Sequence, residues 1–344
     1  MPGKPSDKEN NVETPPLTGP DAPPVVRTDD ARFLGLEDYG FQPHYTQVEF
    51  VDQSLSLRMH YIDEGPRDGR VILMLHGQPS WSYLYRKLVP VFAEAGFRAI
   101  AVDNVGFGRS DKLTFPAHYS LRHHIDWMQA LVQNLDLRDV TLVCQDWGGP
   151  IGLGVLAREP ERFAAVVAAN TILHTGEAAL RGRLNWAVHA TEGENAEVNT
   201  ALLDWMRHSQ RAAHFVASDS LQFATVRPPS AGAIHAWDAP FPSEWHKAGT
   251  RQLSLLIPVT ESDEGAAIGR VTWEALREYD KPFLTLFSDS DPPTRGWETV
   301  FQERIPGARG QPHQTLQNAG HFWQEDCGAE AAQIIVDWLQ SLEA

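Results

Sequence analysis

The sequence predicts an α/β fold in which a mostly parallel, eight-stranded sheet is flanked by helices and carries an inserted helical cap. From about residue 41, short apolar runs alternate with segments of helical period, a pattern typical of parallel sheets. This alternation stops over residues 171–277, a stretch rich in helix formers, Trp and Pro, and then resumes. We therefore expect a leader over residues 1–30, a core over 31–170 and 278–344, and a helical cap over 171–277.

The leader is expected to be flexible. It holds seven of the 24 prolines and almost no apolar run, so it cannot offset the entropy lost on ordering. No apolar stretch suited to a signal peptide follows Lys4, and no later stretch approaches a membrane span of about 18 apolar residues. We expect a cytoplasmic protein without a membrane partner.

The core elements follow one another in a regular order. Residues 44–63 have the pattern of a β-hairpin, and six further strands are expected at 71–75, 98–103, 140–144, 163–169, 282–287 and 314–317. Helical spacing predicts the flanking helices at 83–95, 121–135, 151–158 and 329–342. A cap over the carboxyl ends of such strands is where these folds build ligand sites.

The composition of the chain excludes several classes of partner and cofactor. The apolar fraction of 42% suits a chain with a sizeable core, and the net charge of −16 would repel a polyanion, so no nucleic-acid partner is expected. The two cysteines, Cys144 and Cys327, provide neither a disulfide framework nor a four-thiolate zinc site. We find no metal-ligand spacing and no phosphate-binding glycine fingerprint, and we predict no metal or organic cofactor. A monomer is expected. Tryptophan, with 11 residues, outnumbers tyrosine, with seven.

The segment Cys144–Gly149 has the form of a nucleophile elbow, a strained strand-to-helix turn that lifts one side chain above the sheet. That side chain is Asp146. No G-x-S-x-G occurs in the chain, which argues against a serine esterase or lipase. The simpler alternative is an Asp that caps the following helix.

Three further pieces lie where an Asp-nucleophile mechanism needs them. The segment 76–79 (His-Gly-Gln-Pro) follows an early strand and predicts an oxyanion hole made by the backbone N–H groups of Gln78 and Trp147. Asp291 lies just past a late strand and is preferred to Asp289 as the orienting acid, because it is farther along the loop and precedes Pro. His321, on a late loop after Gly, is the expected general base and completes the order nucleophile, acid, histidine.

These residues resemble the haloalkane dehalogenases of the α/β-hydrolase fold. The segments 76–81 (His-Gly-Gln-Pro-Ser-Trp), 102–111 (Val-Asp-Asn-Val-Gly-Phe-Gly-Arg-Ser-Asp) and 145–149 (Gln-Asp-Trp-Gly-Gly) carry the resemblance, which covers roughly residues 31–344. It is strongest to the subgroup that holds halide with two tryptophans. The chain departs from that subgroup at Gln78, where its members carry Glu.

The resemblance implies hydrolysis of a haloalkane to a primary alcohol, halide and a proton. Asp146 would form an alkyl ester, and water activated by His321 and Asp291 would then hydrolyse it. Trp147 would be the first halide donor. Trp205 is our choice for the second among the cap tryptophans, with Trp186 and Trp237 behind it and Trp245 and Trp273 also in the cap.

Three alternatives remain open. An epoxide hydrolase shares the Asp nucleophile. A resemblance to that family would imply two cap tyrosines that donate to the epoxide oxygen, and residues 171–277 contain no tyrosine. A haloacid dehalogenase would need cationic residues just after the nucleophile, where residues 147–151 offer none. A catalytically inactive sensor would be expected to lose part of the triad.

Overall fold

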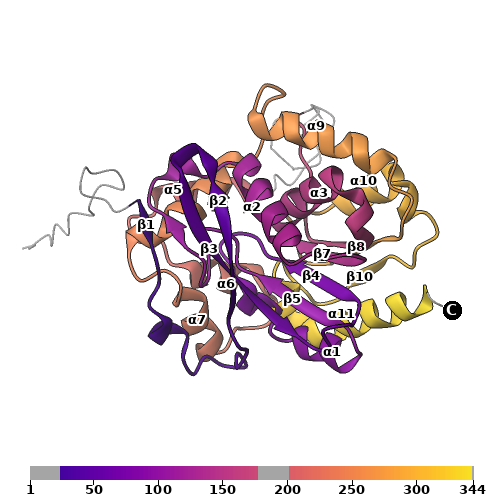
Figure 1. The fold of residues 1–344 in the computed structure, drawn as a ribbon, viewed down its shortest axis with the longest axis horizontal. Coiled ribbons are helices and arrows are strands. Elements are labelled where there is room, and N and C mark those ends of the chain that lie inside the picture. Colours follow the sequence, from indigo (N-terminus) through magenta and orange to yellow (C-terminus); the bar gives the residue numbers. More distant parts are fainter. Residues whose placement is uncertain (1–23, 177–200, 343–344) are drawn as a thin grey trace, which may run out of the picture.

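The computed structural model describes residues 24–176 and 201–342, and its centre is one eight-stranded sheet of order β10-β9-β8-β7-β4-β5-β3-β2 (Figure 1). Strand β3 pairs antiparallel with β2 and with β5, and every other neighbouring pair is parallel. The strand bounds are β2 His44–Phe50, β3 Leu55–Glu64, β4 Val71–Leu75, β5 Arg98–Val102, β7 Val140–Gln145, β8 Phe163–Ala169, β9 Phe283–Ser288 and β10 Gln314–Leu316. The predicted fold class and all eight predicted strands are confirmed.

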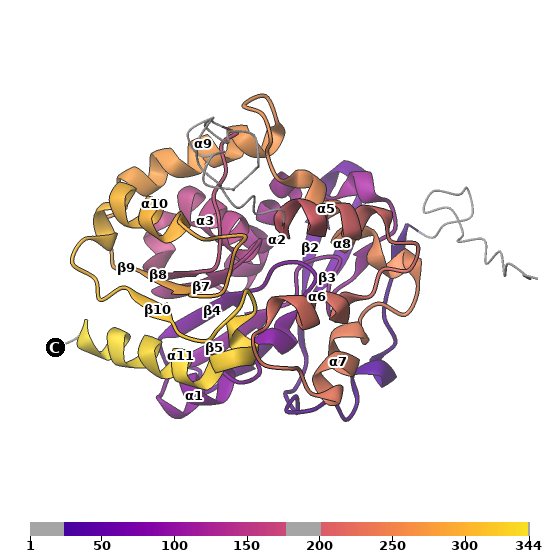
Figure 2. The same ribbon diagram turned by 180° about the vertical axis from the view of Figure 1, so that it is seen from behind.

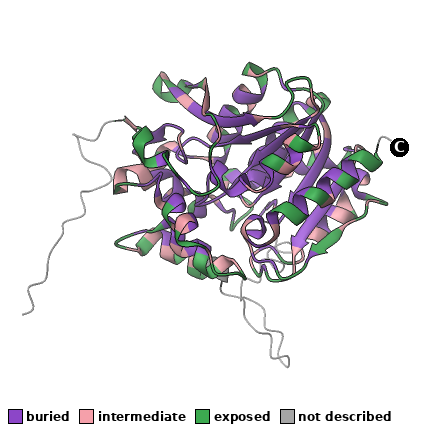
Figure 3. Ribbon diagram, turned by 90° about the horizontal axis from the view of Figure 1, so that it is seen from below, coloured by how far each residue is buried: buried purple, intermediate pink, exposed green. Residues whose placement is uncertain are grey.

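Helices cover both faces of the sheet because its inner strands are apolar on both faces. In β4, Leu73 and Leu75 belong to one buried cluster, while Ile72 and Met74 belong to the other. One face carries α2 (Leu121–Asn134), α3 (Gly148–Arg158), α9 (Glu264–Arg277) and α10 (Trp297–Arg304), and the other carries α1 (Val89–Glu94) and α11 (Trp323–Ser341). Figure 3 shows the result, with buried strands inside and exposed residues on the outer sides of the helices.

One predicted helix is wrong in its extent. The segment 83–95 was expected to be a single helix, but it consists of a 3₁₀ turn at Ser82–Tyr85 followed by α1. Pro90 explains the break, because proline lacks an N–H and is tolerated only in the first turn of a helix. The closing helix α11 has non-helical dihedrals at Cys327, so its long regular part begins near residue 329, as predicted.

The cap lies over the carboxyl ends of the parallel strands (Figure 2). Its helices are α5 (Ala201–Arg211), α6 (Ala217–Ala224), α7 (Ala231–Asp238) and α8 (Ala248–Leu253). The buried carboxylate of Asp326 joins the cap to the core, since it accepts hydrogen bonds from the backbone N–H groups of Val226, Arg227 and Gly320. Helix α9, at the end of the predicted cap, packs on α2 and α3 beside the sheet.

The segment 24–30 packs on the core and the cap, although the sequence placed it in a flexible leader; residues 1–23 of that leader lie outside the described residues. Strand β1 (Val25–Val26) pairs antiparallel with β6 (Lys112–Leu113). Thr28 is buried and donates a hydrogen bond to the Pro240 carbonyl. These contacts supply the burial that the Pro-rich composition alone does not suggest. Across the described ranges, none of the helices has the length and apolar character needed to cross a bilayer.

Candidate active site

Asp146 stands at the tip of a sharp turn between β7 and α3. Its φ of 51° lies in the left-handed region, which is unfavourable for a residue with a Cβ, so the surrounding structure must hold it there. A Cβ on Gly148 would clash with the Leu75 carbonyl oxygen, so only glycine allows helix α3 to begin this close to β4. The Thr171 hydroxyl donates to the Asp146 carbonyl at 2.6 Å. The expected elbow is therefore present in the backbone.

The loop after β4 lies directly against the Asp146 carboxylate. The Gln78 N–H donates to Asp146 Oδ1 at 2.7 Å. A Cβ on Gly77 would clash with the same oxygen, which makes glycine necessary for this close approach. Trp147 stands at the start of α3, where backbone N–H groups have no intrahelical partner, but within the described residues its N–H makes no hydrogen bond to the carboxylate. Of the two predicted oxyanion donors, the structure thus brings Gln78 onto the carboxylate.

His321 lies between two carboxylates. Its Nε2 is 3.4 Å from Asp146 Oδ2, and its Nδ1 is 3.0 Å from Asp291 Oδ1. Asp291 is 1% exposed, and its other oxygen accepts a hydrogen bond from the Thr294 hydroxyl. The three side chains come from the loops after β7, β9 and β10, and they form the continuous line that the sequence predicted.

Asp289, the rival acid, faces elsewhere. Its oxygens accept hydrogen bonds from the backbone N–H groups of Asn318 at 2.9 Å and Ala319 at 3.2 Å. These bonds hold the start of the loop that carries His321, and they lower the pKa of Asp289. The structure therefore pairs His321 with Asp291.

The protonation of His321 is set by opposing effects. Burial lowers the pKa of the imidazole, but Asp291 and Asp146 outweigh it and raise the pKa to about 10. The Gln145 side-chain amide lies 2.9 Å from Nε2 and, as a donor, favours the neutral ring. With both carboxylates ionised the imidazolium is favoured, and this preference depends on the charge of Asp146.

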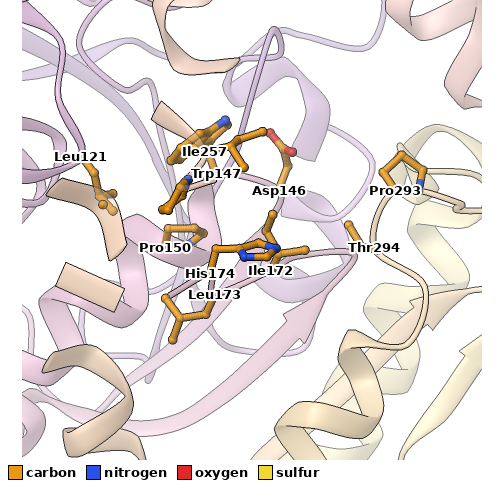
Figure 4. A pocket seen from close by; sticks show the side chains of 12 residues that line it. Leu121, Asp146, Trp147, Pro150, Ile172, Leu173, His174, Ile257, Pro293 and Thr294 are labelled. Atoms are coloured by element: carbon orange, nitrogen blue, oxygen red, sulfur yellow. The ribbon is translucent and has the colours of Figure 1, made fainter. Parts of the chain in front are cut away.

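Two cavities meet at Asp146. The larger, of about 410 Å³, lies between the cap and the strand ends; its lining includes Gln78, Asp146, Trp205, Asp291 and His321. The smaller, of about 40 Å³, is lined by Asp146 and Trp147 among other residues (Figure 4). The two predicted halide donors therefore lie beside the nucleophile but line different cavities. Trp205 donates its indole N–H to Gln78 Oε1 at 3.4 Å.

The other cap tryptophans that the structure describes line neither cavity. Trp237 is buried against Phe322 and donates to Glu325 Oε1 at 3.3 Å. Trp273 is buried and donates to the Leu173 carbonyl. Trp245 is half-buried. Trp186 lies outside the described residues. Among the described cap tryptophans, the geometry favours Trp205.

Sequence reasoning missed a residue that supports the site. Asn170 follows β8 with a φ of 43°, and its side-chain amide donates to the Ser288 hydroxyl and to the Gly320 carbonyl, each at 2.9 Å, and to the His321 carbonyl at 3.1 Å. It thereby joins the loops that carry the acid and the base. An Asn directly after a buried strand, where left-handed backbone is tolerated, was the available signal.

Comparison with known proteins agrees with this geometry. The family model for the alpha/beta hydrolase fold matches residues 70–326. A haloalkane dehalogenase of Psychrobacter cryohalolentis is 45% identical over 315 residues, which cover 92% of this chain and 98% of that protein. A second, from Mycolicibacterium paratuberculosis, is 40% identical over 92% of this chain and 99% of its own length.

The chain belongs to the haloalkane dehalogenase family. Among solved structures, the tetrameric haloalkane dehalogenase DpaA from Paraglaciecola agarilytica is 31% identical, covers 90% of this chain with 97% of its own, and superposes with a TM-score of 0.77. The haloalkane dehalogenase DbeA from Bradyrhizobium elkani, at 22% identity and a TM-score of 0.68, shares the fold. Membership of this family confirms the resemblance and decides between a dehalogenase and an epoxide hydrolase in favour of the former.

Proposed function

We propose that this haloalkane dehalogenase hydrolyses haloalkanes through a covalent ester on Asp146, giving a primary alcohol, a halide ion and a proton. The observation that carries the proposal is the line from Asp146 through His321 to Asp291 at the floor of the larger cavity, with separations of 3.4 and 3.0 Å. No cofactor has a part in the scheme.

In the first step, Asp146 displaces the halide from a saturated carbon. Its Oδ1 is held by the Gln78 N–H, which leaves Oδ2 for the attack in line with the carbon–halogen bond. The carbon–halogen electron pair departs with the halide. We assign Trp147 and Trp205 to stabilise that ion, because an indole N–H is a hydrogen-bond donor that cannot act as a nucleophile.

In the second step, water attacks the ester carbonyl. Once Asp146 is esterified it carries no charge, so one of the two carboxylates that raise the pKa of His321 is lost and the imidazole releases its proton to solvent. Neutral His321, oriented by Asp291, then accepts a proton from the attacking water. The Gln78 N–H stabilises the oxyanion, and we assign the Trp147 N–H the same role. The alcohol leaves, and the carboxylate and the imidazolium are restored.

The test is to stop the cycle between the two steps. His321→Gln should allow alkylation but not hydrolysis, so after mixing with 1-bromobutane the intact mass should rise by one butyl group, located at Asp146 by peptide mapping. The control is the double variant His321→Gln with Asp146→Ala, which should gain no mass. A His321→Gln protein that releases bromide continuously, or stays unmodified, would contradict the scheme.

The assembly and the cellular location are proposals of the same kind. We infer a cytoplasmic monomer that takes a small halogenated molecule as its partner, with no nucleic acid and no membrane. Both cysteines are free thiols, Cys144 buried and Cys327 half-buried, which suits a reducing compartment. Because DpaA is a tetramer, light scattering coupled to size exclusion is the direct check: a mass above that of one chain would overturn the monomer.

A further inference from the structure

Gln78 makes side-chain contacts that the catalytic line does not use. The side chain is 4% exposed and lines the larger cavity. Its Nε2 donates a hydrogen bond to the carbonyl oxygen of Thr250 in α8, and its Oε1 accepts the indole N–H of Trp205 in α5 at 3.4 Å. One buried amide therefore joins the loop after β4 to two helices of the cap.

The two partners fix the direction in which the Gln78 amide faces. A carbonyl oxygen only accepts a hydrogen bond and an indole N–H only donates one, so the amide nitrogen must face Thr250 and the amide oxygen must face Trp205. The Thr250 carbonyl is among the last four of α8, and the last four carbonyls of a helix have no partner within the helix. The end of α8 thus orients the amide.

The same residue contacts the nucleophile through its backbone. The Gln78 N–H donates to Asp146 Oδ1 at 2.7 Å, while the side-chain oxygen accepts from Trp205. The Trp205 ring also packs against His208 and Phe215, at centroid distances of 5.9 and 5.8 Å. Ring contacts of this kind limit the tilt of the indole, whereas a hydrogen bond sets where its N–H points. Gln78 therefore relates the direction of that N–H to the position of the attacking carboxylate.

A second glutamine separates this role from simple attachment of the cap helices to each other. Gln210, also in α5, donates through Nε2 to the carbonyl of Arg251, the residue after Thr250, and to the Ser254 hydroxyl at 3.1 Å. It lines neither of the two cavities. Gln210 thus joins α5 to the end of α8, as Gln78 joins the loop after β4 to it, but its amide bonds do not involve the Trp205 indole.

We propose that Gln78 is a positioning residue for halide release: its side-chain amide, oriented by the Thr250 carbonyl, aims the indole N–H of Trp205 at the place where the halide ion forms. This rests on the proposed function, in which Trp205 is the second halide donor. Gln78 acts through Trp205, because its own Nε2 faces Thr250. An anion is a stronger acceptor than a neutral amide oxygen, so the departing halide takes the N–H from Oε1, and a bond of 3.4 Å is given up at little cost.

The test is a double-mutant cycle between Gln78 and Trp205. Gln78→Met keeps a similar volume without either polar atom and should lower kcat/KM for 1-bromobutane roughly tenfold, the effect of about one hydrogen bond. In a Trp205→Phe background the same substitution should lower it by less than about twofold, because the N–H that Gln78 aims is already absent. A merely structural role gives the same loss in both backgrounds, and equal losses would overturn the inference.

Gln210→Met is the matched control. It removes a hydrogen bond between α5 and α8 but leaves the acceptor of the Trp205 indole in place. It should lower thermal stability, and its effect on kcat/KM, expected to be below about threefold, should be equal in the wild-type and Trp205→Phe backgrounds. If its loss also disappeared in the Trp205→Phe background, attachment of the cap would account for the cycle and the role of Gln78 would be wrong.

A measurement on the wild type covers the case in which Gln78→Met fails to fold. Bromide should shift the NMR signals of the Gln78 side-chain amide, identified by their absence from Gln78→Glu, and leave those of Gln210 in place. Gln78 signals that do not respond to bromide would contradict the inference. Failure of the proposed function gives a different result: Trp205→Phe alone would then keep full bromide release and full fluorescence quenching, and the inference would fall with it.

Discussion

The larger cavity has two sides, one formed by the loops at the carboxyl ends of the strands and the other by the cap. The side chains of the two sides are held in different ways. At the carboxyl ends of the strands, the Asp146 and Asp291 carboxylates are fixed by hydrogen bonds from Gln78 and Thr294. On the cap, the lining comes from helix surfaces, and Phe223 at the rim is 82% exposed. The reacting groups are therefore positioned by hydrogen bonds on rigid loops, whereas the cap shapes the cavity through side chains that can change at small structural cost.

The largest expected effect is a loss of kcat from a change in the loop after β9, at the carboxyl end of that strand. Asp291→Asn removes the charge that orients His321 and stabilises its protonated form, so kcat should fall roughly 100-fold or more. Asp289→Asn is the matched control: an acceptor oxygen is kept for the backbone of Asn318, and kcat should change by less than about threefold. Steady-state bromide release measures both. A larger loss for Asp289→Asn would reassign the orienting acid.

A smaller effect is expected from the cap. Trp205→Phe removes the indole N–H that we propose as the second halide donor, and it should lower kcat/KM roughly 10- to 100-fold, together with the halide quenching of tryptophan fluorescence. Trp237→Phe changes a tryptophan that packs on Phe322, so it should lower thermal stability but keep the halide response. If the quenching by bromide persists in Trp205→Phe and disappears in Trp237→Phe, the two assignments must be exchanged.

The smallest expected effect is on stability: His321 and His246 should change the free energy of unfolding with pH in opposite directions. The pKa of His321 is raised from 6.5 to about 10, so its contribution to the free energy of unfolding is fully present below about pH 6.5 and is lost as the pH rises towards 10. His246, in the cap, has its pKa lowered from 6.5 to about 4, mainly by burial, so its contribution is present above pH 6.5 and is lost as the pH falls towards 4. Urea unfolding of the wild type, His321→Gln and His246→Gln between pH 4 and 10 measures both differences. Parallel curves for all three proteins would contradict the two shifts.

The difference between the strand-end loops and the cap also explains which residues could be predicted from the sequence. Asp146, Asp291 and His321 could be identified because each follows a strand in a fixed chain order, and the turn residues beside them have few alternatives. In the cap, composition pointed to tryptophan donors and the family resemblance pointed to Trp205, but neither could show that Trp147 and Trp205 line different cavities.

The lining of the smaller cavity and the start of helix α1 could not be predicted from local sequence patterns. His174 is one of 14 histidines, and the cavity that it lines is formed by elements far apart in the chain. Pro90 did carry a signal, since it marks the start of α1, but the helical spacing of the apolar residues around it suggested a longer helix. Periodicity reports which face is buried, and it says less about where the backbone can begin a helix.

The carboxylate of Asp326 has a consequence for how molecules pass in and out. It holds the backbone of Val226 and Arg227 in the cap and of Gly320 beside the general base, so a hinge motion that lifted this part of the cap would strip a buried carboxylate of its donors. We therefore expect residues 226–227 of the cap and the loop that carries His321 to open together. We therefore expect substrate and alcohol to pass by side-chain rotation at the rim, where Phe223 is 82% exposed, while the loop that carries His321 stays in place.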